Sequence, residues 1–292
     1  MTRSPVHLRV GVVGAGRVGA VLGAALARAG HHIVAASGVS SRSRALAQRW
    51  LPDTPLLPPD EVVAAADLVL LAVPDDALRP LVNGLAATDS WRPGQIAAHT
   101  CGAHGIGVLD AASARGVIPL ALHPVMTFAG RGEDLDRLQG APFGVTALDE
   151  MRAVAETLVM EIGGEPVWVP ERARPAYHTA LSMSANYLVT IINDSLDLLD
   201  QSGVEHSDHL VAPLLSAALD NVLRLRDAAL TGPVSRGDAG TVGAHLATLR
   251  AQAPHLVAEY TELARRTAAR AHHSGQLNDT ALAAVEAVLG TQ

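Results

Sequence analysis

The sequence predicts an α/β protein: a doubly wound N-terminal domain with a mainly parallel sheet, followed by an all-α C-terminal domain. Short β-branched runs alternate with helical segments over the first half of the chain. A glycine-rich turn joins the first of these runs to the first helix. From about residue 172, leucine and alanine recur at helical spacing. We therefore place the two domains at residues 1–170 and 171–292.

The expected strands follow one another in a strand–helix alternation. The segment at 67–73 is continuously apolar, as expected for a strand that is buried on both faces. Helices are expected at 17–29 and 44–50, and a final helix at 279–289. The other six strands are expected at 8–13, 32–36, 96–98, 118–122, 143–146 and 166–169.

The composition limits the classes of function. With 49% hydrophobic and 17% charged residues, the 292-residue chain can bury a sizeable core. Its net charge of −7 disfavours non-specific nucleic-acid binding. The single cysteine, Cys101, excludes a cysteine-cluster metal site and an intramolecular disulfide, and the lack of lysine excludes a lysine acid. The apolar run at 18–27 is shorter than the roughly 20 residues of a membrane span, so we expect a cytoplasmic protein with no membrane partner. We also expect no metal, because no carboxylate or cysteine completes a ligand set with His99 and His104.

A glycine-rich turn follows the first expected strand and opens the first helix. Its residues are Gly14, Ala15, Gly16, Arg17, Val18 and Gly19. Gly14 permits a tight turn, Gly16 lets the backbone approach a pyrophosphate, and Gly19 lets the helix pack closely on the strand. The alternative is a turn that binds nothing, but the strand and helix around it favour a dinucleotide-binding domain of the Rossmann type.

The end of the second strand distinguishes the two nicotinamide coenzymes. NAD enzymes place an acidic residue there, and this chain has none. It has Ser37, Ser41 and Arg42 instead, and hydroxyl and guanidinium donors suit a 2′-phosphate. Alternatively, Arg42 and Arg44 are exposed residues in the first turn of a helix. We expect NADP(H) as the cofactor.

The carboxyl ends of the next strands are also polar, and ligands bind there in open parallel sheets. Val73, Pro74 and Thr100 are expected to contact the coenzyme, and His123 the substrate. For Asp75 or Asp76 we favour a plainer role as the N-cap of the next helix.

The second domain carries a row of polar residues on its first helix. His178, Ser182 and Asn186 are spaced by four residues and would share one face of an α-helix. On a buried helix these groups need partners, which a substrate in the interdomain cleft would supply. We interpret all three as catalytic. A structural network between helices is the alternative.

A second polar segment, residues 229–238, interrupts two helices with glycine and proline. We expect Thr231 and Arg236 to bind the substrate, Arg236 through a carboxylate. The alternatives are an ion pair between Arg236 and Asp238, and a helix cap formed by Asp238 or Thr241.

Together these motifs resemble bacterial proteins in which a Rossmann-like domain is joined to an uncharacterised helical domain. The most specific of them is Thr-Gly-Pro-Val-Ser-Arg-Gly-Asp at 231–238. Such proteins are similar to pyrroline-5-carboxylate reductase and, more distantly, to 6-phosphogluconate and 3-hydroxyisobutyrate dehydrogenases. The resemblance implies NADP-dependent oxidoreduction and a homodimer formed by the helical domains, and some members are linked with ketopantoate reduction.

The chain departs from the usual ketopantoate reductases and hydroxyacid dehydrogenases, which use a lysine as the acid. His178 takes the comparable position, so we expect it to protonate the product of hydride transfer to a small carboxylate-bearing keto acid of the ketopantoate type. The alternatives are an imine reductase of the pyrroline-5-carboxylate reductase type and a non-catalytic NADPH-binding sensor or scaffold.

Overall fold

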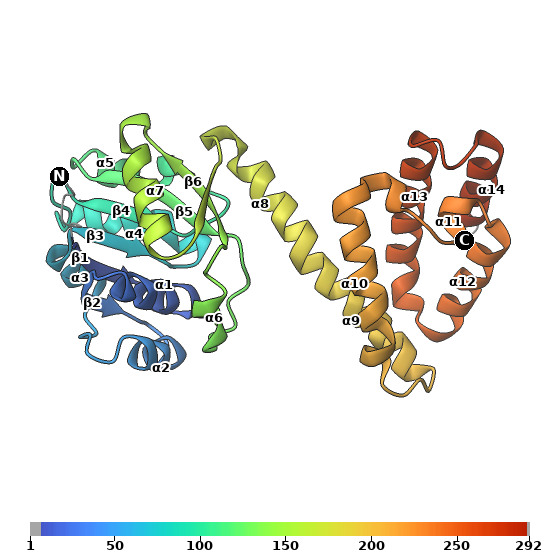
Figure 1. The fold of residues 1–292 in the computed structure, drawn as a ribbon, viewed down its shortest axis with the longest axis horizontal. Helices are drawn as coiled ribbons and strands as arrows, with labels where there is room; N and C mark the ends of the chain where they lie inside the picture. Colours follow the sequence, from blue (N-terminus) through green and yellow to red (C-terminus); the bar gives the residue numbers. More distant parts are fainter. Residues whose placement is uncertain (1–6, 291–292) are drawn as a thin grey trace. The chain divides into compact units, whose positions relative to one another are not determined.

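The computed structural model describes residues 7–290. It consists of two compact units, Met1–Ser182 and Met183–Gln292 (Figure 1). Both predicted fold classes are confirmed: the first unit is built around a mostly parallel sheet, and the second contains only helices among its described residues.

All seven expected strands are present. They are β1 (Arg9–Val13), β2 (His32–Ser37), β3 (Leu68–Leu71), β4 (Ile96–His99), β5 (Ile118–Pro124), β6 (Pro142–Ala147) and β7 (Glu165–Trp168). The strand order is β2-β1-β3-β4-β5-β6-β7. Strands β1 to β5 run parallel, whereas β6 is antiparallel to β5 and β7 is parallel to β6. The last two strands therefore run against the first five.

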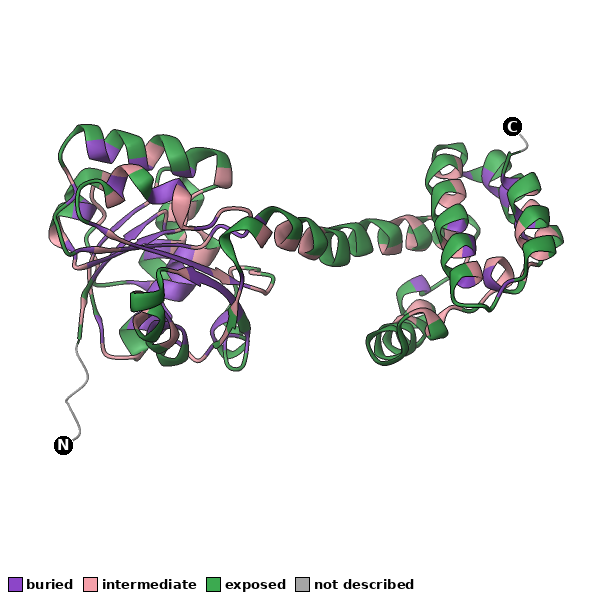
Figure 2. Ribbon diagram, turned by 90° about the horizontal axis from the view of Figure 1, so that it is seen from above, coloured by how far each residue is buried: buried purple, intermediate pink, exposed green. Residues whose placement is uncertain are grey.

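Helices cover both faces of the sheet. They are α1 (Arg17–Arg28), α2 (Ser41–Trp50), α3 (Pro59–Ala65), α4 (Asp75–Ala87), α5 (Asp110–Ser113), α6 (Glu133–Asp136) and α7 (Arg152–Glu161). Helix α8 (Arg174–Ser182) runs away from the sheet, and Arg174 at its start is its buried residue (Figure 1). Strand β3 shows why its sequence is continuously apolar: Leu68 and Leu70 belong to the core under α1 and α7, while Val69 and Leu71 belong to the core under α3 and α4. Figure 2 shows these strands as mostly buried.

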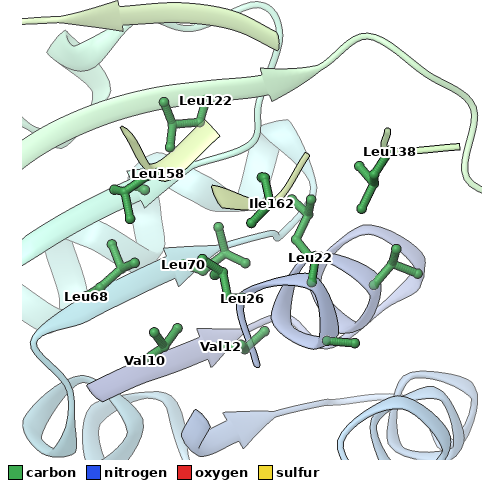
Figure 3. Packing of buried hydrophobic residues seen from close by; sticks show 14 of the residues in the cluster. Val10, Val12, Leu22, Leu26, Leu68, Leu70, Leu122, Leu138, Leu158 and Ile162 are labelled. Atoms are coloured by element: carbon green, nitrogen blue, oxygen red, sulfur yellow. The ribbon is translucent and has the colours of Figure 1, made fainter. Parts of the chain in front are cut away.

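The core between α1, α7 and the sheet is formed by aliphatic side chains. Leu22 and Leu26 of α1 lie beside Ile162, at the end of α7, above the strand residues Val12 and Leu70 (Figure 3). Each of these side chains is at most 7% exposed. At roughly 1.5–3 kcal/mol for each fully buried aliphatic side chain, this packing contributes much of the stability of the first unit.

Helices α2 and α3 differ from the sequence prediction. Helix α2 begins at Ser41 rather than residue 44, because Ser40 and Ser43 form a capping box at its start. Helix α3 follows a proline-rich connection in which no helix was expected; Pro59 occupies its first turn, the one helical position that tolerates the missing N–H.

The second unit packs around three of its helices. Its elements are a π-helix (Met183–Tyr187), α9 (Leu188–Gln201), α10 (Ser207–Leu225), α11 (Pro233–Arg236), α12 (Ala239–Gln252), α13 (Val257–His273) and α14 (Asp279–Gly290). The core comes from α12, α13 and α14 and includes Val242, Leu246, Ala268 and Val285. By contrast, α9 has no buried residue and α10 has one, Ser207. Within residues 7–290 we find no helix with the length and apolar character of a membrane span.

Candidate active site

The glycine-rich turn has the geometry that a bound pyrophosphate requires. Gly14 has a φ of +92°, and a Cβ there would lie 2.6 Å from the carbonyl oxygen of Ala72. A Cβ on Gly19 would collide with the carbonyl oxygen of Gly14. Gly16 differs, because its φ of −79° suits any residue and no heavy atom lies within 4 Å of the position of its missing Cβ. Gly14 and Gly19 thus pack tightly against the backbone of the protein, whereas the space beside Gly16 is open.

Ser37, at the end of β2, supports this turn. Its hydroxyl accepts a hydrogen bond from the Gly14 amide at 3.2 Å, and its carbonyl oxygen accepts one from Ala15 at 2.8 Å. The side chain is buried. Ser37 therefore fixes the conformation of the turn, which is a more direct role than the 2′-phosphate contact that we expected.

Ser41 and Arg42 lie in the first turn of α2, directly after β2, and both are exposed. This placement suits both interpretations from the sequence, a 2′-phosphate contact and an exposed helix start. The hydroxyl of Ser40 caps the helix by accepting the Ser43 amide at 3.0 Å, so Ser41 is not needed as the cap.

A loop that the sequence analysis missed lies beside the turn. It follows β5, and Arg17 donates from Nη1 to the carbonyl oxygen of Phe128 at 3.4 Å. The carboxylate of Asp134 is fully buried and accepts hydrogen bonds from the backbone amides of Ala129, Gly130 and Arg131. An aspartate at the start of a short helix, preceded by two glycines, was the available signal.

The carboxyl end of β3 completes this side of the site. A Cγ atom of Val73 lies 3.0 Å from the Cβ position of Gly14, so the expected coenzyme residues at the two strand ends are adjacent. The N-cap role expected of Asp75 or Asp76 is wrong: Pro74 is the N-cap of α4, and the two aspartates are its first two residues. The Cys101 thiol donates a hydrogen bond to Asp75, and burial, together with this bond, raises the pKa of Cys101 to about 12. Cys101 is thus a buried, protonated thiol.

Helix α8 brings the chain back to the carboxyl ends of β1 to β5. Strand β7 runs antiparallel to those strands and therefore ends beside their amino ends. Helix α8 then places Tyr177 next to His123, at the carboxyl end of β5. The Tyr177 hydroxyl lies 2.8 Å from Nδ1 of His123. The His123 and His178 rings have centroids 6.0 Å apart and are nearly perpendicular.

Gly102, which follows β4, lies directly against both imidazoles. A Cβ at this position would be 2.5 Å from Cδ2 of His178 and 2.9 Å from Nε2 of His123. The strand ends and α8 therefore bring His123 and His178 together over a backbone without a side chain. Thr100, two residues earlier, is half-buried, and its amide donates to the carbonyl oxygen of Leu71.

The imidazole of His123 is neutral at pH 7. Burial lowers its pKa to about 4, the positive charges of Arg174 and protonated His178 act in the same direction, and Asp75 opposes them. Neutral imidazole has one donor and one acceptor nitrogen, which sets the hydrogen bonds that it forms.

A buried arginine lies beneath this pair. Arg174 is 1% exposed; its Nε donates to the Thr146 hydroxyl at 2.8 Å, and its Nη2 donates to the carbonyl oxygens of Ala121 and Gly144. Its Nη1 has no hydrogen-bond partner, and the guanidinium forms no ion pair, within residues 7–290. The guanidinium carbon lies 5.6 Å from the ring centre of Tyr177.

His99 has a structural role. Its Nδ1 accepts the Cys101 amide and its Nε2 donates to the carbonyl oxygen of Gly105 at 2.9 Å, so both ring nitrogens are used. On the other side of this loop, the carboxylate of Glu171 accepts the amides of Ile106 and Gly107. The segment after β4 is thus fastened both to the sheet and to the start of α8.

Because His99 is buried, the free energy of unfolding is expected to fall as the pH is lowered. Burial lowers its pKa from 6.5 to about 4, so between these values the unfolded chain binds a proton that the folded protein does not. The stabilisation is complete above about pH 6.5 and is lost as the pH falls toward 4. We expect His99 alone to reduce the free energy of unfolding by about 2 kcal/mol between pH 7.5 and 5.

Denaturant titrations at the two pH values check this expectation. His99→Gln removes the titrating group, so its loss between pH 7.5 and 5 is expected to be smaller than that of the unchanged protein. His32→Gln, at an exposed position, is the control and keeps the full loss. Equal losses in all three proteins would contradict the assignment.

The remaining predicted site residues are spread along the chain. Ser182 is the last residue of α8 and is half-buried, whereas Asn186 lies in the π-helix of the second unit and is exposed. The spacing of four residues that we assumed for one α-helical face does not extend through a π-helix, and the helix is not buried there. The sequence gives no local signal for this change of helix type.

Thr231 and Arg236 lie before and at the end of α11, and both are exposed. Asp238 is the N-cap of α12: its carboxylate accepts the Thr241 amide at 3.1 Å and the Thr241 hydroxyl at 2.7 Å. The alternative of a helix cap is thereby confirmed for Asp238. Arg236 forms no ion pair with any residue of the described range 7–290.

Two family models match the chain. Residues 2–124 match the Rossmann-like domain, and residues 141–267 match a domain of unknown function, DUF2520. The chain combines a Rossmann-like domain with a DUF2520 domain. The DUF2520 match begins at the second-last strand of the sheet, so it includes β6, β7 and α8 as well as the helices that follow. No curated protein matches the chain.

Several solved structures share the fold of this chain. A protein from Bacteroides fragilis that is proposed to be an NADP oxidoreductase is 23% identical, with a TM-score of 0.73 over 90% of this chain and 98% of that one. An imine reductase variant from Myxococcus stipitatus, in complex with NAD+, is 15% identical, with a TM-score of 0.59 over 96% and 100%. Pyrroline carboxylate reductase from Plasmodium falciparum, with NADP bound, is 15% identical, with a TM-score of 0.55 over 90% and 98%.

Proposed function

We propose that the protein is an NADP(H)-dependent oxidoreductase that reduces a small carboxylate-bearing substrate. The observation that carries the proposal is the placement of an open glycine turn and a histidine pair on one edge of one sheet. Gly16 leaves space where a pyrophosphate passes, and His123 and His178 meet over Gly102 at the ends of neighbouring strands. The similar solved structures that bind NADP or NAD+ support the same conclusion.

The residues of the turn fit such a coenzyme. The open position at Gly16 and the amide groups that begin α1 would hold the pyrophosphate. Val73, Pro74 and Thr100 would contact the part of the coenzyme at the strand ends. Exposed Ser41 and Arg42, with no acidic residue after β2, favour a 2′-phosphate and hence NADP(H). When bound, the coenzyme supplies the hydride.

In the proposed reaction the protein supplies the proton and the orientation. His178 is the general acid, because this chain has no lysine to take that role. Ser182 would hydrogen-bond the reacting group as charge develops, and His123 would contact the substrate.

The substrate is a keto acid of the ketopantoate type or a cyclic imine of the pyrroline-5-carboxylate type. The imine is the second candidate. The absence of lysine supports it, since the reduction of a protonated imine needs less help from an acid. The assay follows NADPH oxidation with ketopantoate and pyrroline-5-carboxylate side by side, and repeats the active reaction with NADH.

His178→Ala is expected to lower kcat at least 100-fold with the better substrate, as is usual for the loss of a general acid. His209→Ala is the matched control, because His209 is exposed on α10. If NADPH binds and no keto acid or imine is reduced, the protein is a coenzyme-binding sensor or scaffold and the catalytic proposal is wrong. Equal activity of His178→Ala and wild type would remove His178 from its role.

We also propose that the helical unit forms a homodimer. Helix α10 exposes four leucines, Leu210, Leu214, Leu219 and Leu223, by 51–72%. The first two form one i, i+4 pair and the last two another, and the five-residue step between the pairs places them on opposite faces of the helix. A groove of about 480 Å³ lies between α9 and α13 and is lined by Ile191, Leu198 and Leu263, among others. Apolar surface of this extent is typical of a protein interface, and a two-fold dimer in which each α10 packs between helices of the partner would cover both pairs.

Sedimentation equilibrium tests the homodimer. Leu214→Asp with Leu223→Asp is expected to shift the protein from dimer to monomer at micromolar concentration, because each partner would bury a charge. Val39→Asp is the control: Val39 is 92% exposed but lies in the first unit, after β2. A wild-type monomer, or a dimer that the double substitution leaves intact, would overturn the proposal.

A further inference from the structure

The hydroxyl of Tyr177 is committed to one hydrogen bond. It lies 2.8 Å from His123 Nδ1, and this is its hydrogen bond within residues 7–290. On its other side it lies against Gly144, where a Cβ would overlap the hydroxyl. A phenol donates its proton to a neutral imidazole nitrogen, because that nitrogen is the stronger acceptor of the two. The pair therefore favours Nδ1 of His123 as the acceptor, which would place the imidazole proton on Nε2.

Nε2 of His123 points to the space above Gly102. The Cβ position of Gly102 is 2.9 Å from Nε2, and no residue of the described range accepts a hydrogen bond from this nitrogen. His178 borders the same position. A donor without a protein acceptor therefore lies beside the proposed acid, at the strand end where the substrate is expected.

Arg174 keeps this arrangement fixed. Three hydrogen bonds anchor the guanidinium to β5 and β6, and it packs near the ring of Tyr177. Its charge opposes protonation of His123, as does that of protonated His178, whereas Asp75 of α4 favours protonation. Because burial is the largest effect on His123 and also lowers its pKa, the neutral form prevails.

We propose that Tyr177 and Arg174 are positioning residues that hold His123 as the Nε2–H tautomer, and that this N–H donates a hydrogen bond to the reacting oxygen or nitrogen of the substrate. The inference rests on the proposed function. The substrate carbon gains a hydride from NADPH, its oxygen or nitrogen gains a proton from the His178 imidazolium, and His178 is left neutral. His123 keeps its proton throughout, so it polarises the bond while His178 transfers the proton.

The two histidines thus have different tasks although their rings are 6.0 Å apart. His123 is also half-buried, but as a neutral imidazole with a fixed tautomer it is a poor acid and a well-oriented donor. The half-buried His178 lies in α8 and has no hydrogen bond to a described residue that would fix its tautomer. If the two histidines have these separate tasks, Tyr177 would not touch the substrate and would affect the reaction only through His123.

Nitrogen NMR of the histidine side chains tests the tautomer without any substrate. In the wild type, His123 is expected to be the Nε2–H form at pH 7 and to remain neutral down to about pH 5, as its pKa of about 4 requires. In Tyr177→Phe, Nδ1 loses its donor, and a mixture of both tautomers is expected. Tyr260→Phe is the matched control, because the Tyr260 hydroxyl lies 2.9 Å from Nδ1 of a different histidine, His245.

The same variants are then assayed with the better substrate. Tyr177→Phe is expected to lower kcat about tenfold and to leave the Kd for NADPH unchanged, whereas Tyr260→Phe has no effect on either. In Arg174→Lys, which keeps the charge, His123 is expected to stay neutral at pH 6. An Nδ1–H tautomer in the wild type, or an unchanged tautomer in Tyr177→Phe, would overturn the inference. Absence of turnover with a correct tautomer would instead contradict the proposed function.

Discussion

Gly16→Ala is expected to weaken NADPH binding at least tenfold, about 1.4 kcal/mol, while it leaves the melting temperature nearly unchanged. The reason is geometric. The backbone at Gly16 has an ordinary conformation and its Cβ would enter empty space, so the folded protein loses nothing. The added methyl group would instead occupy the space through which the pyrophosphate approaches the turn.

Gly19→Ala is the contrasting variant. Its Cβ would meet the carbonyl oxygen of Gly14, so α1 or the turn must shift, at a cost of about 1–3 kcal/mol. Calorimetry with NADPH and thermal unfolding of the apo protein separate the two effects. Wild-type affinity in Gly16→Ala would show that the coenzyme does not cross the turn at this position, and the proposed binding site would then be wrong.

Asp134→Ala is expected to cost about 3 kcal/mol and to release the loop after β5. The substitution leaves the amides of Ala129, Gly130 and Arg131 without their acceptor, and an unsatisfied donor costs roughly 1–3 kcal/mol when it is fully buried. Partial hydration of the freed loop reduces the sum. Because the loop is bonded to Arg17, weaker NADPH binding is expected as well.

Trypsin reports the release directly, since Arg131 is exposed within the loop. Faster cleavage after Arg131 is expected in Asp134→Ala, together with a lower melting temperature. Asp136→Ala is the control, because Asp136 lies in the same short helix and is exposed. Cleavage at the wild-type rate in Asp134→Ala would show that the three hydrogen bonds do not hold the loop.

The parts of the molecule that the sequence predicted are those with local causes. Strand β3 was predicted because its apolar run needs two covered faces, and the turn at Gly14 because its glycine spacing is required by close backbone contacts. The all-α second unit was predicted from the recurrence of leucine and alanine alone.

The parts that could not be predicted depend on long-range partners. The contact of Tyr177 with His123 joins residues 54 positions apart and requires that β6 runs antiparallel to β5, which no local pattern specifies. Arg174 was unremarkable in the sequence, because a single arginine gives no sign that it will be buried. The loop at 129–134 was missed for the same reason: the carboxylate of Asp134 has only backbone partners.

The burial of Arg174 also sets an order of assembly. Its acceptors are the Thr146 hydroxyl and two carbonyl oxygens of β5 and β6, so the guanidinium can leave water at low cost only after those two strands have paired. The nucleotide turn needs only β1, α1, β2 and β3, all from the first quarter of the chain. A nascent chain would therefore complete its coenzyme turn well before Tyr177 and His123 can meet, and the histidine pair would be among the last features of the unit to form.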